Sequence, residues 1–239
     1  MAGGQTLRYL ICGMTGGGKS TNGRKLIREL KGEGKYRQLV VVNRKREFED
    51  LCEKHYSVDE QGDPAQALAD HPSLFFHVTG YDPRPFLNNL GQALMQHNSR
   101  DVLLVVDEAY EFFPRGRVPR GLFRVITGGR EHGHHCLFMT QMLKSASGGI
   151  DIGVLDQLSH LAVLKMQGEG NVERVKHYFP ELGERCQYLK RPNDPEGAPP
   201  EIAIKDLLSH TATVRLRSAH DPFVLVDKDL SQPSEAAAF

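Results

Sequence analysis

Gly13-Met14-Thr15-Gly16-Gly17-Gly18-Lys19-Ser20 follows an apolar run at residues 7–12 and opens a segment with helical periodicity at residues 19–30. Its glycines permit backbone angles that other residues avoid, so successive N–H groups can curl around an anion, toward which the following helix points its positive end. This pattern, between a strand and a helix, is typical of a loop that binds nucleotide phosphates. The alternative, a glycine-rich turn with a surface lysine, does not account for the complete motif.

The loop suggests a role for each of its polar residues. Lys19 would bridge the β- and γ-phosphates of ATP, and the hydroxyl of Ser20 would bind Mg²⁺. We therefore expect ATP and Mg²⁺ as ligands. The predicted nucleotide-binding residues are Gly13, Thr15, Gly16, Gly17, Gly18, Lys19, Ser20 and Thr21.

A second motif is the apolar run at residues 102–106, which ends in Asp107 and Glu108. Strands of a parallel sheet present their active residues at the carboxyl edge, which would place Asp107 beside Ser20. Asp107 would hold Mg²⁺ through its water shell, and Glu108 would polarise an attacking water, as a hydrolase requires. An acidic pair that merely caps a helix is the alternative, but the phosphate loop independently requires an acidic partner.

The fold follows from the order of apolar and amphipathic segments. Predicted strands at residues 7–12, 39–42, 74–78, 102–106, 136–139 and 161–164 alternate with predicted helices at residues 19–30, 48–55, 85–97 and 119–126. This alternation predicts an α/β fold of the P-loop NTPase type, in which helices cover both faces of a parallel sheet.

Composition changes near the carboxyl terminus suggest a domain division. We expect an ATPase domain over residues 1–190. Residues 191–200 are rich in Pro and Gly and read as a linker, and runs at residues 211–217 and 223–226 predict a hairpin. Residues 191–230 would thus form a small β appendage, and residues 231–239 a disordered tail.

Charge and hydropathy exclude several classes of protein. The chain of 239 residues has 30 basic and 30 acidic side chains, so any anionic partner must meet a local patch. No apolar run approaches the roughly 18–20 residues of a membrane-spanning helix, and no signal-peptide pattern opens the chain, so we expect an intracellular protein. The cysteines at positions 12, 52, 136 and 186 lack paired spacing and are expected to be reduced and buried.

Residues 129–141 carry a family resemblance. They begin Gly129-Arg130-Glu131-His132-Gly133, continue as an apolar strand and end in Thr140-Gln141. With Asp107-Glu108-Ala109, this resembles the HerA/FtsK superfamily of DNA-pumping ATPases over residues 7–164, and more weakly to about residue 182. The resemblance implies an additional strand between the Walker A strand, which precedes the phosphate loop, and the Walker B strand, which ends at Asp107. Gln141 at its tip would sense the γ-phosphate.

The resemblance also implies a shared active site. In that superfamily the matching arginine reaches the ATP of the neighbouring subunit, so Arg130 is the candidate arginine finger, with Arg124 and Arg120 as fallbacks. A solvated arginine at a helix end is the alternative. The implied assembly is a homo-oligomeric ring of five or six subunits, with its exact size left open.

Size narrows the resemblance further. Without membrane segments or an amino-terminal barrel, the chain is most similar to the genome-packaging ATPases of tailless viruses with an internal membrane. That similarity implies translocation of double-stranded DNA into a preformed capsid, in the host cytoplasm or at the packaging vertex of the virion, with a capsid-vertex or membrane protein as a further partner. The direction of movement and the host stay open.

Five arginines and no carboxylates lie between residues 115 and 130, which suits a positive ring lumen. Arg115, Arg117 and Arg120 are the candidate DNA contacts, and they would grip the backbone without reading bases. The cluster Arg44-Lys45-Arg46 reads more readily as a solvated loop. A zinc site at residues 132–136 is disfavoured because adjacent strand residues point to opposite faces.

Two other functions remain open from sequence. A P-loop small-molecule kinase is disfavoured because Glu108 follows Asp107 and because no arginine-rich lid recurs late in the chain. An assembly or extrusion ATPase similar to those of filamentous phages would usually carry a membrane segment.

Overall fold

The computed structural model describes residues 6–58, 64–80, 82–96, 101–145, 148–192, 201–208, 215–217 and 225–227. Its main sheet has eight strands in the order β10-β9-β1-β6-β5-β2-β4-β3. The strands are β1 Arg8–Cys12, β2 Gln38–Asn43, β3 Lys54–Val58, β4 Ser73–Val78, β5 Val102–Val106, β6 His135–Thr140, β9 His160–Val163 and β10 Ala203–Asp206. Neighbouring strands pair in parallel, except that β10 is antiparallel to β9.

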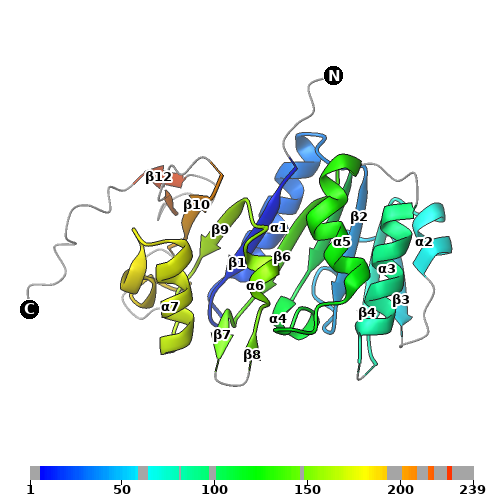
Figure 1. The fold of residues 1–239 in the computed structure, drawn as a ribbon. Helices are drawn as coiled ribbons and strands as arrows, with labels where there is room; N and C mark the ends of the chain where they lie inside the picture. Colours follow the sequence, from blue (N-terminus) through cyan, green and yellow to red (C-terminus); the bar gives the residue numbers. More distant parts are fainter. Residues whose placement is uncertain are drawn as a thin grey trace, which may run out of the picture.

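The helices cover both faces of this sheet, as Figure 1 shows. They are α1 Lys19–Gly32, α2 Pro64–Asp70, α3 Arg84–Gln96, α4 Ala109–Phe112, α5 Arg120–Gly128, α6 Ile152–Leu155 and α7 Glu169–Tyr178, with short 3₁₀ turns η1 Glu49–Leu51, η2 Gly129–His132 and η3 Gly183–Gln187. The predicted α/β fold is confirmed. So is the additional strand, because β6 lies between β1 and β5.

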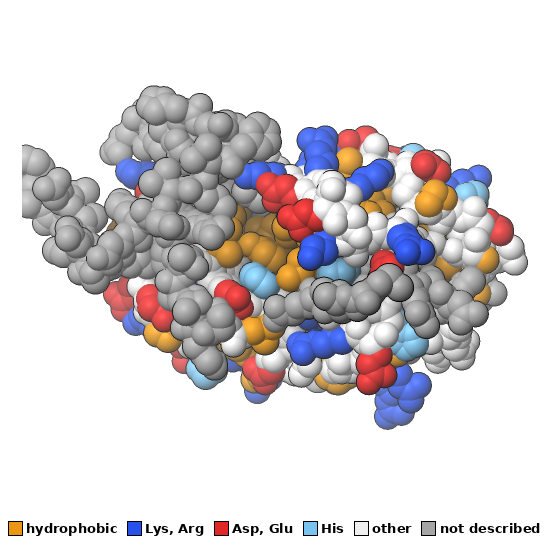
Figure 2. Space-filling view, turned by 90° about the horizontal axis from the view of Figure 1, so that it is seen from above, with side chains coloured by type: hydrophobic (Ala, Val, Ile, Leu, Met, Phe, Trp, Pro, Cys, Tyr) orange, Lys and Arg blue, Asp and Glu red, His pale blue; other side chains and the backbone are white. Residues whose placement is uncertain are grey.

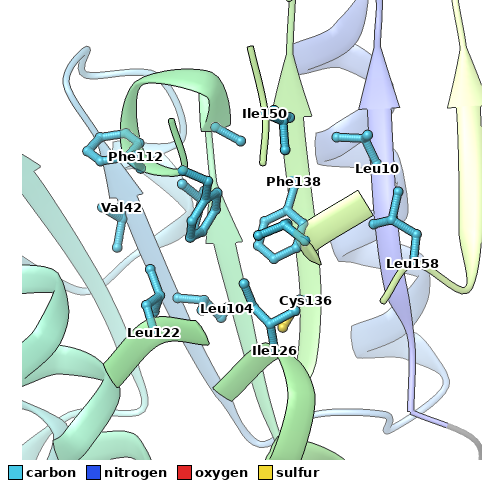
Figure 3. Packing of buried hydrophobic residues seen from close by; sticks show 14 of the residues in the cluster. Leu10, Val42, Leu104, Phe112, Leu122, Ile126, Cys136, Phe138, Ile150 and Leu158 are labelled. Atoms are coloured by element: carbon cyan, nitrogen blue, oxygen red, sulfur yellow. The ribbon is translucent and has the colours of Figure 1, made fainter. Parts of the chain in front are cut away.

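Successive side chains of each central strand point to opposite faces of the sheet, so the core is divided into two layers. On β1, Leu10 and Cys12 face the layer that contains α3, α5, α6 and α7, whereas Ile11 faces the layer that contains α1. Figure 3 shows the first layer, in which Phe138 of β6 lies among side chains from neighbouring strands and from helices α4 and α5. The central strands β2, β5 and β6 are buried on both sides, which explains their continuous apolar runs in the sequence.

Two short β-pairs lie outside the main sheet. β11 Arg215–Arg217 pairs antiparallel with β12 Leu225–Asp227, in the region of the predicted hairpin, and β7 Lys144–Ser145 pairs with β8 Gly148–Gly149. Most of the predicted linker and all of the predicted tail lie outside the described residues. The domain division stays a prediction, although β10, within the expected appendage, extends the main sheet through β9.

The predicted helix at residues 48–55 is wrong. The chain instead forms η1 and then the edge strand β3. Phe48 has a left-handed backbone (φ 73°), from which a helix cannot propagate, but its ring is fully buried beside α1. The helical spacing of apolar residues thus reflects a single tight turn. β3 is largely exposed at the sheet edge and has no apolar alternation to announce it.

Helices α3 and α5 pack backbone to backbone. A Cβ atom on Gly91 would lie 2.1 Å from the carbonyl carbon of Gly121, and one on Gly121 would lie 2.2 Å from the carbonyl oxygen of Asn88. The Gly121 N–H also donates to Asn88 Oδ1 at 2.9 Å. These glycines let α5 lie close against α3, because no larger residue fits the crossing.

Arg8, the first residue of β1, is a buried cation. Its guanidinium is fully enclosed and donates to the backbone carbonyls of Ile126 (2.8 Å), Val125 (3.3 Å) and His134 (2.5 Å). The first two carbonyls belong to the last turn of α5, where a helix favours positive charge. Arg8 therefore ties the start of β1 to the end of α5 and to the segment that follows it.

The four cysteines are free and buried. Within the described ranges, every helix is too short or too polar to cross a lipid bilayer.

Candidate nucleotide-binding site

The phosphate loop is held at the carboxyl edge of the sheet. The Gly13 N–H donates to the carbonyl of Thr140 at 3.1 Å, and the Met14 N–H donates to the carbonyl of Lys165 at 2.8 Å. Gly18 precedes α1 in a left-handed conformation (φ 93°), which turns the chain into the helix. The loop is thus anchored between the ends of β6 and β9, and α1 starts directly from it.

Lys19 folds back over this loop. Its ammonium donates to the carbonyls of Gly13 (3.0 Å) and Met14 (3.3 Å). Burial lowers the pKa of Lys19, and the nearby carboxylates of Glu108 and Asp107 oppose that shift. A phosphate placed against the loop would meet this ammonium together with the N–H groups of the first turn of α1.

A pocket of about 330 Å³ opens in front of the loop. Its lining residues are Thr15, Gly16, Gly18, Lys19, Ser20, Thr21, Lys45, Glu47, Asp107, Glu108 and Pro192. The structure thus places the loop residues and the acidic pair around one cavity, although they come from opposite ends of the first half of the chain.

Asp107 and Glu108 are both almost fully buried, with 4% and 6% of their surfaces exposed. Burial, and next the charge of Glu108, raises the pKa of Asp107 to about 6. Asp107 Oδ2 accepts from Asn43 Nδ2 at 3.1 Å, and Oδ1 accepts from the Glu108 N–H at 3.0 Å. Two adjacent carboxylates in so buried a position favour a cation beside them, and with the Ser20 hydroxyl across the same pocket they fit the few protein ligands of Mg²⁺.

Gln141 links the three strand ends. Its amide donates from Nε2 to Glu108 Oε1 at 3.1 Å, and its Oε1 accepts from Thr15 Oγ1 at 2.6 Å. Thr15 follows β1, Glu108 follows β5, and Gln141 follows β6 between them. A group at this position touches both the phosphate loop and the carboxylate proposed to polarise water.

The segment after β2 contributes site residues that the sequence analysis missed. Besides Asn43, they are Glu47, which accepts a hydrogen bond from the Ser20 hydroxyl, and Lys45, whose Nζ lies 3.1 Å from Glu108 Oε1. β2 lies beside β5 in the sheet, so its carboxyl end faces the same pocket. A run of polar residues directly after a buried strand was the available signal.

In the loop Arg44-Lys45-Arg46, Lys45 and Arg46 are exposed and Arg44 is half-buried, and all three side chains form ion pairs within the chain. Arg44 pairs with Glu111 at 2.8 Å and lies over the ring of Phe112, and Arg46 pairs with Glu49 at 3.0 Å.

Arg130 lies far from the pocket of its own chain. It is exposed in η2, directly before β6 begins, and therefore at the amino edge of the sheet, whereas the pocket is at the carboxyl edge. Figure 2 looks down on the amino edge, where Lys and Arg side chains are interspersed with Asp and Glu. A role for Arg130 in catalysis would require the pocket of another subunit.

The other candidate arginines lie elsewhere. Arg115 and Arg117 are exposed in the loop between α4 and α5. The Arg115 N–H donates to the Gly149 carbonyl at 3.2 Å, which connects this loop to β8. Arg120 and Arg124 are exposed on α5, one turn apart. Arg115 and Arg117 thus share the carboxyl edge with the pocket, and α5 separates them from Arg130.

Two of the three histidines of the disfavoured zinc site bind backbone groups. The buried His134 places Nε2 3.1 Å from the carbonyl of Leu94, and His135 Nδ1 accepts from the Leu7 N–H at 3.0 Å. No cluster of three or more potential metal-binding His, Cys, Asp or Glu side chains occurs in the described part of the chain.

The sheet order, the loop at its carboxyl edge and the acidic pair define a P-loop NTPase fold of the class with an additional strand. Within that class, the fold is similar to the genome packaging NTPase of Sulfolobus turreted icosahedral virus 2. The complex of that protein with AMP superposes with a TM-score of 0.69 at 18% identity, over 90% of this chain and 98% of the other. Its complex with AMPPCP gives 0.67 at 19% identity over the same shares.

The DNA-packaging ATPase of Sulfolobus turreted icosahedral virus has the same fold, with a TM-score of 0.63 at 15% identity over 86% of this chain and 95% of that one. These identities establish likeness of fold. Comparison of the sequence with protein-family models and with curated proteins gives no match.

Proposed function

We propose that this chain is an ATPase subunit of a motor that moves double-stranded DNA, and that it packages a viral genome into a preformed capsid. The observation that carries the ATPase assignment is the position of Gln141, which bridges Thr15 of the phosphate loop and Glu108 of the acidic pair. The packaging role is supported by the fold it shares with two viral packaging enzymes.

The residues of the pocket divide the work of hydrolysis. Lys19 and the N–H groups of the loop bind the β- and γ-phosphates, while Ser20 and Asp107 hold Mg²⁺. The metal, when bound, neutralises charge that develops on the phosphate oxygens. Glu108 polarises the attacking water, and Gln141, hydrogen-bonded to Glu108, orients that water against the γ-phosphate.

The finger and the DNA contacts require an assembly. Arg130 is at the edge of the sheet opposite to its own pocket, so it would complete the site of a neighbouring subunit in a homo-oligomeric ring of five or six copies. Arg115, Arg117 and Arg120 are exposed and would contact DNA phosphates in the lumen. We place this ring in the host cytoplasm or at the packaging vertex of the virion, against a capsid-vertex or membrane protein.

The test is the steady-state ATPase rate as a function of protein concentration, with and without double-stranded DNA. We expect turnover to rise with assembly and with DNA. It should fall by about 10³-fold or more in Arg130→Ala. Arg28→Ala, which removes an exposed arginine from α1, is the matched control and should behave as the wild type. An ATPase rate that does not depend on protein concentration, on DNA or on Arg130 would overturn the proposed motor function and favour a small-molecule kinase.

A further inference from the structure

Lys45 is a second lysine in the pocket, and the mechanism above gives it no role. It follows β2, lines the cavity with Lys19, and donates from Nζ to Glu108 Oε1 at 3.1 Å. More than half of its side chain is exposed (57%), whereas that of Glu108 is buried (7%). Lys45 thus approaches the buried carboxylate from the open side of the pocket.

This contact restrains Glu108. Oε1 of Glu108 accepts from both Lys45 and Gln141, and among the described atoms its buried Oε2 has no hydrogen-bond partner. The charge-assisted hydrogen bond from the Lys45 ammonium occupies a carboxylate oxygen that could otherwise accept a hydrogen bond from an attacking water. The ion pair also raises the pKa of Lys45, so the side chain keeps its charge at neutral pH.

The charges around the pocket favour a second partner for this ammonium, the γ-phosphate of ATP. The lining includes the carboxylates of Glu47, Asp107 and Glu108, against the ammonium groups of Lys19 and Lys45. A third phosphate adds negative charge to a cavity that already holds an excess of carboxylates. The ammonium of Lys45 is mobile enough to meet it, because the side chain is a flexible four-carbon stem with rotatable donors and is largely exposed.

We propose that Lys45 is a γ-phosphate-binding lysine that exchanges partners, leaving Glu108 for the γ-phosphate when ATP binds and returning to Glu108 when ADP remains. The exchange releases Glu108 to polarise water only when a γ-phosphate is present. This inference rests on the proposed ATPase function and adds to it a residue that distinguishes a triphosphate from a diphosphate.

The first test compares Mg-AMPPCP with Mg-ADP by titration calorimetry. In Lys45→Met the affinity for AMPPCP should fall by about tenfold, as expected for the loss of a charged hydrogen bond, while the affinity for ADP should change by less than about twofold. Arg46→Met is the matched control, because it removes the adjacent positive charge, which pairs with Glu49 outside the pocket. It should leave both affinities unchanged.

A double-mutant cycle tests the exchange itself. Glu108→Gln removes the competing partner and should tighten AMPPCP binding, and this gain should vanish when Lys45→Met is added. A gain that persists in the double variant, or equal losses for AMPPCP and ADP in Lys45→Met, would overturn the inference. Wild-type protein that binds neither nucleotide would instead overturn the proposed function, so the two failures can be told apart.

Discussion

Asp107 holds a negative charge in a place where charge is unfavourable. Its pKa of about 6 is above the usual value of an aspartate, chiefly because of burial and then because of Glu108. The folded protein therefore takes up a proton between the unfolded and the folded pKa, at pH values where the unfolded chain does not. The stabilisation from this group is full below the unfolded pKa and is lost as pH rises through about 6.

This linkage predicts that Asp107→Asn stabilises the protein at pH 8 but not at pH 3.5. Without Mg²⁺, the free energy of unfolding at pH 8 should increase by about 1–3 kcal/mol, since the variant avoids a buried charge. Denaturant titrations at the two pH values measure the difference. With Mg²⁺ and nucleotide the same variant should lose binding. An equal change at both pH values would contradict the buried-charge explanation.

At the scale of single residues, the sequence predicted the loop and the acidic pair because each is a local pattern that follows an apolar strand. Asn43, Lys45 and Glu47 escaped prediction for a physical reason. Their role depends on β2 lying beside β5, and chain order alone does not fix which strands are neighbours. The sequence of Arg44-Lys45-Arg46 predicts a solvated loop, but it gives no sign that Arg44 pairs with Glu111 and Lys45 with Glu108.

Among the elements, the crossing of α3 and α5 is the least tolerant of added volume. Gly121→Ala should lower the free energy of unfolding by about 2 kcal/mol or more, because its methyl group would meet the backbone of Asn88 and the helices would have to separate. Gly32→Ala, at the end of α1, is the control. It has open space and should be neutral or stabilising by up to about 1 kcal/mol. Thermal or denaturant unfolding measures both.

A comparable stability for Gly121→Ala and Gly32→Ala would mean that the helices do not cross so closely.

The sequence signalled α3 and α5 through their apolar spacing, and both were predicted to within two residues. It did not signal β10, whose alternate residues Ala203 and Lys205 are buried against β9, because one of the two is a lysine.

For the whole molecule, the separation of Arg130 from its own pocket leads to a mixing experiment. Lys19→Ala removes the phosphate-binding lysine and Arg130→Ala the finger, so neither variant should hydrolyse ATP alone. A mixture should regain part of the activity, because some interfaces then join an intact pocket to an intact finger. The readout is the ATPase rate of the mixture against the summed rates of the two variants.

Mixed oligomers must be shown to form, for example by co-purification of one tagged variant with the other. Co-assembly without recovered activity would contradict a finger supplied in trans.

The sequence suggested this division of the site only through its resemblance to ring ATPases. The structure adds that the segment of Arg130 and the pocket occupy opposite edges of one sheet, an arrangement that depends on the direction of β6.

Through strand β1, Arg8 connects the two edges of the sheet at which the pocket and Arg130 lie. Its guanidinium fastens the strand that carries the phosphate loop to the last turn of α5 and to the chain around Arg130. If Arg130 completes the site of the neighbouring subunit in a closed ring, a displacement of β1 by nucleotide would reach Arg130 through the hydrogen bonds of Arg8. In such a ring, two adjacent ATP sites would be connected through the hydrogen bonds of one buried side chain.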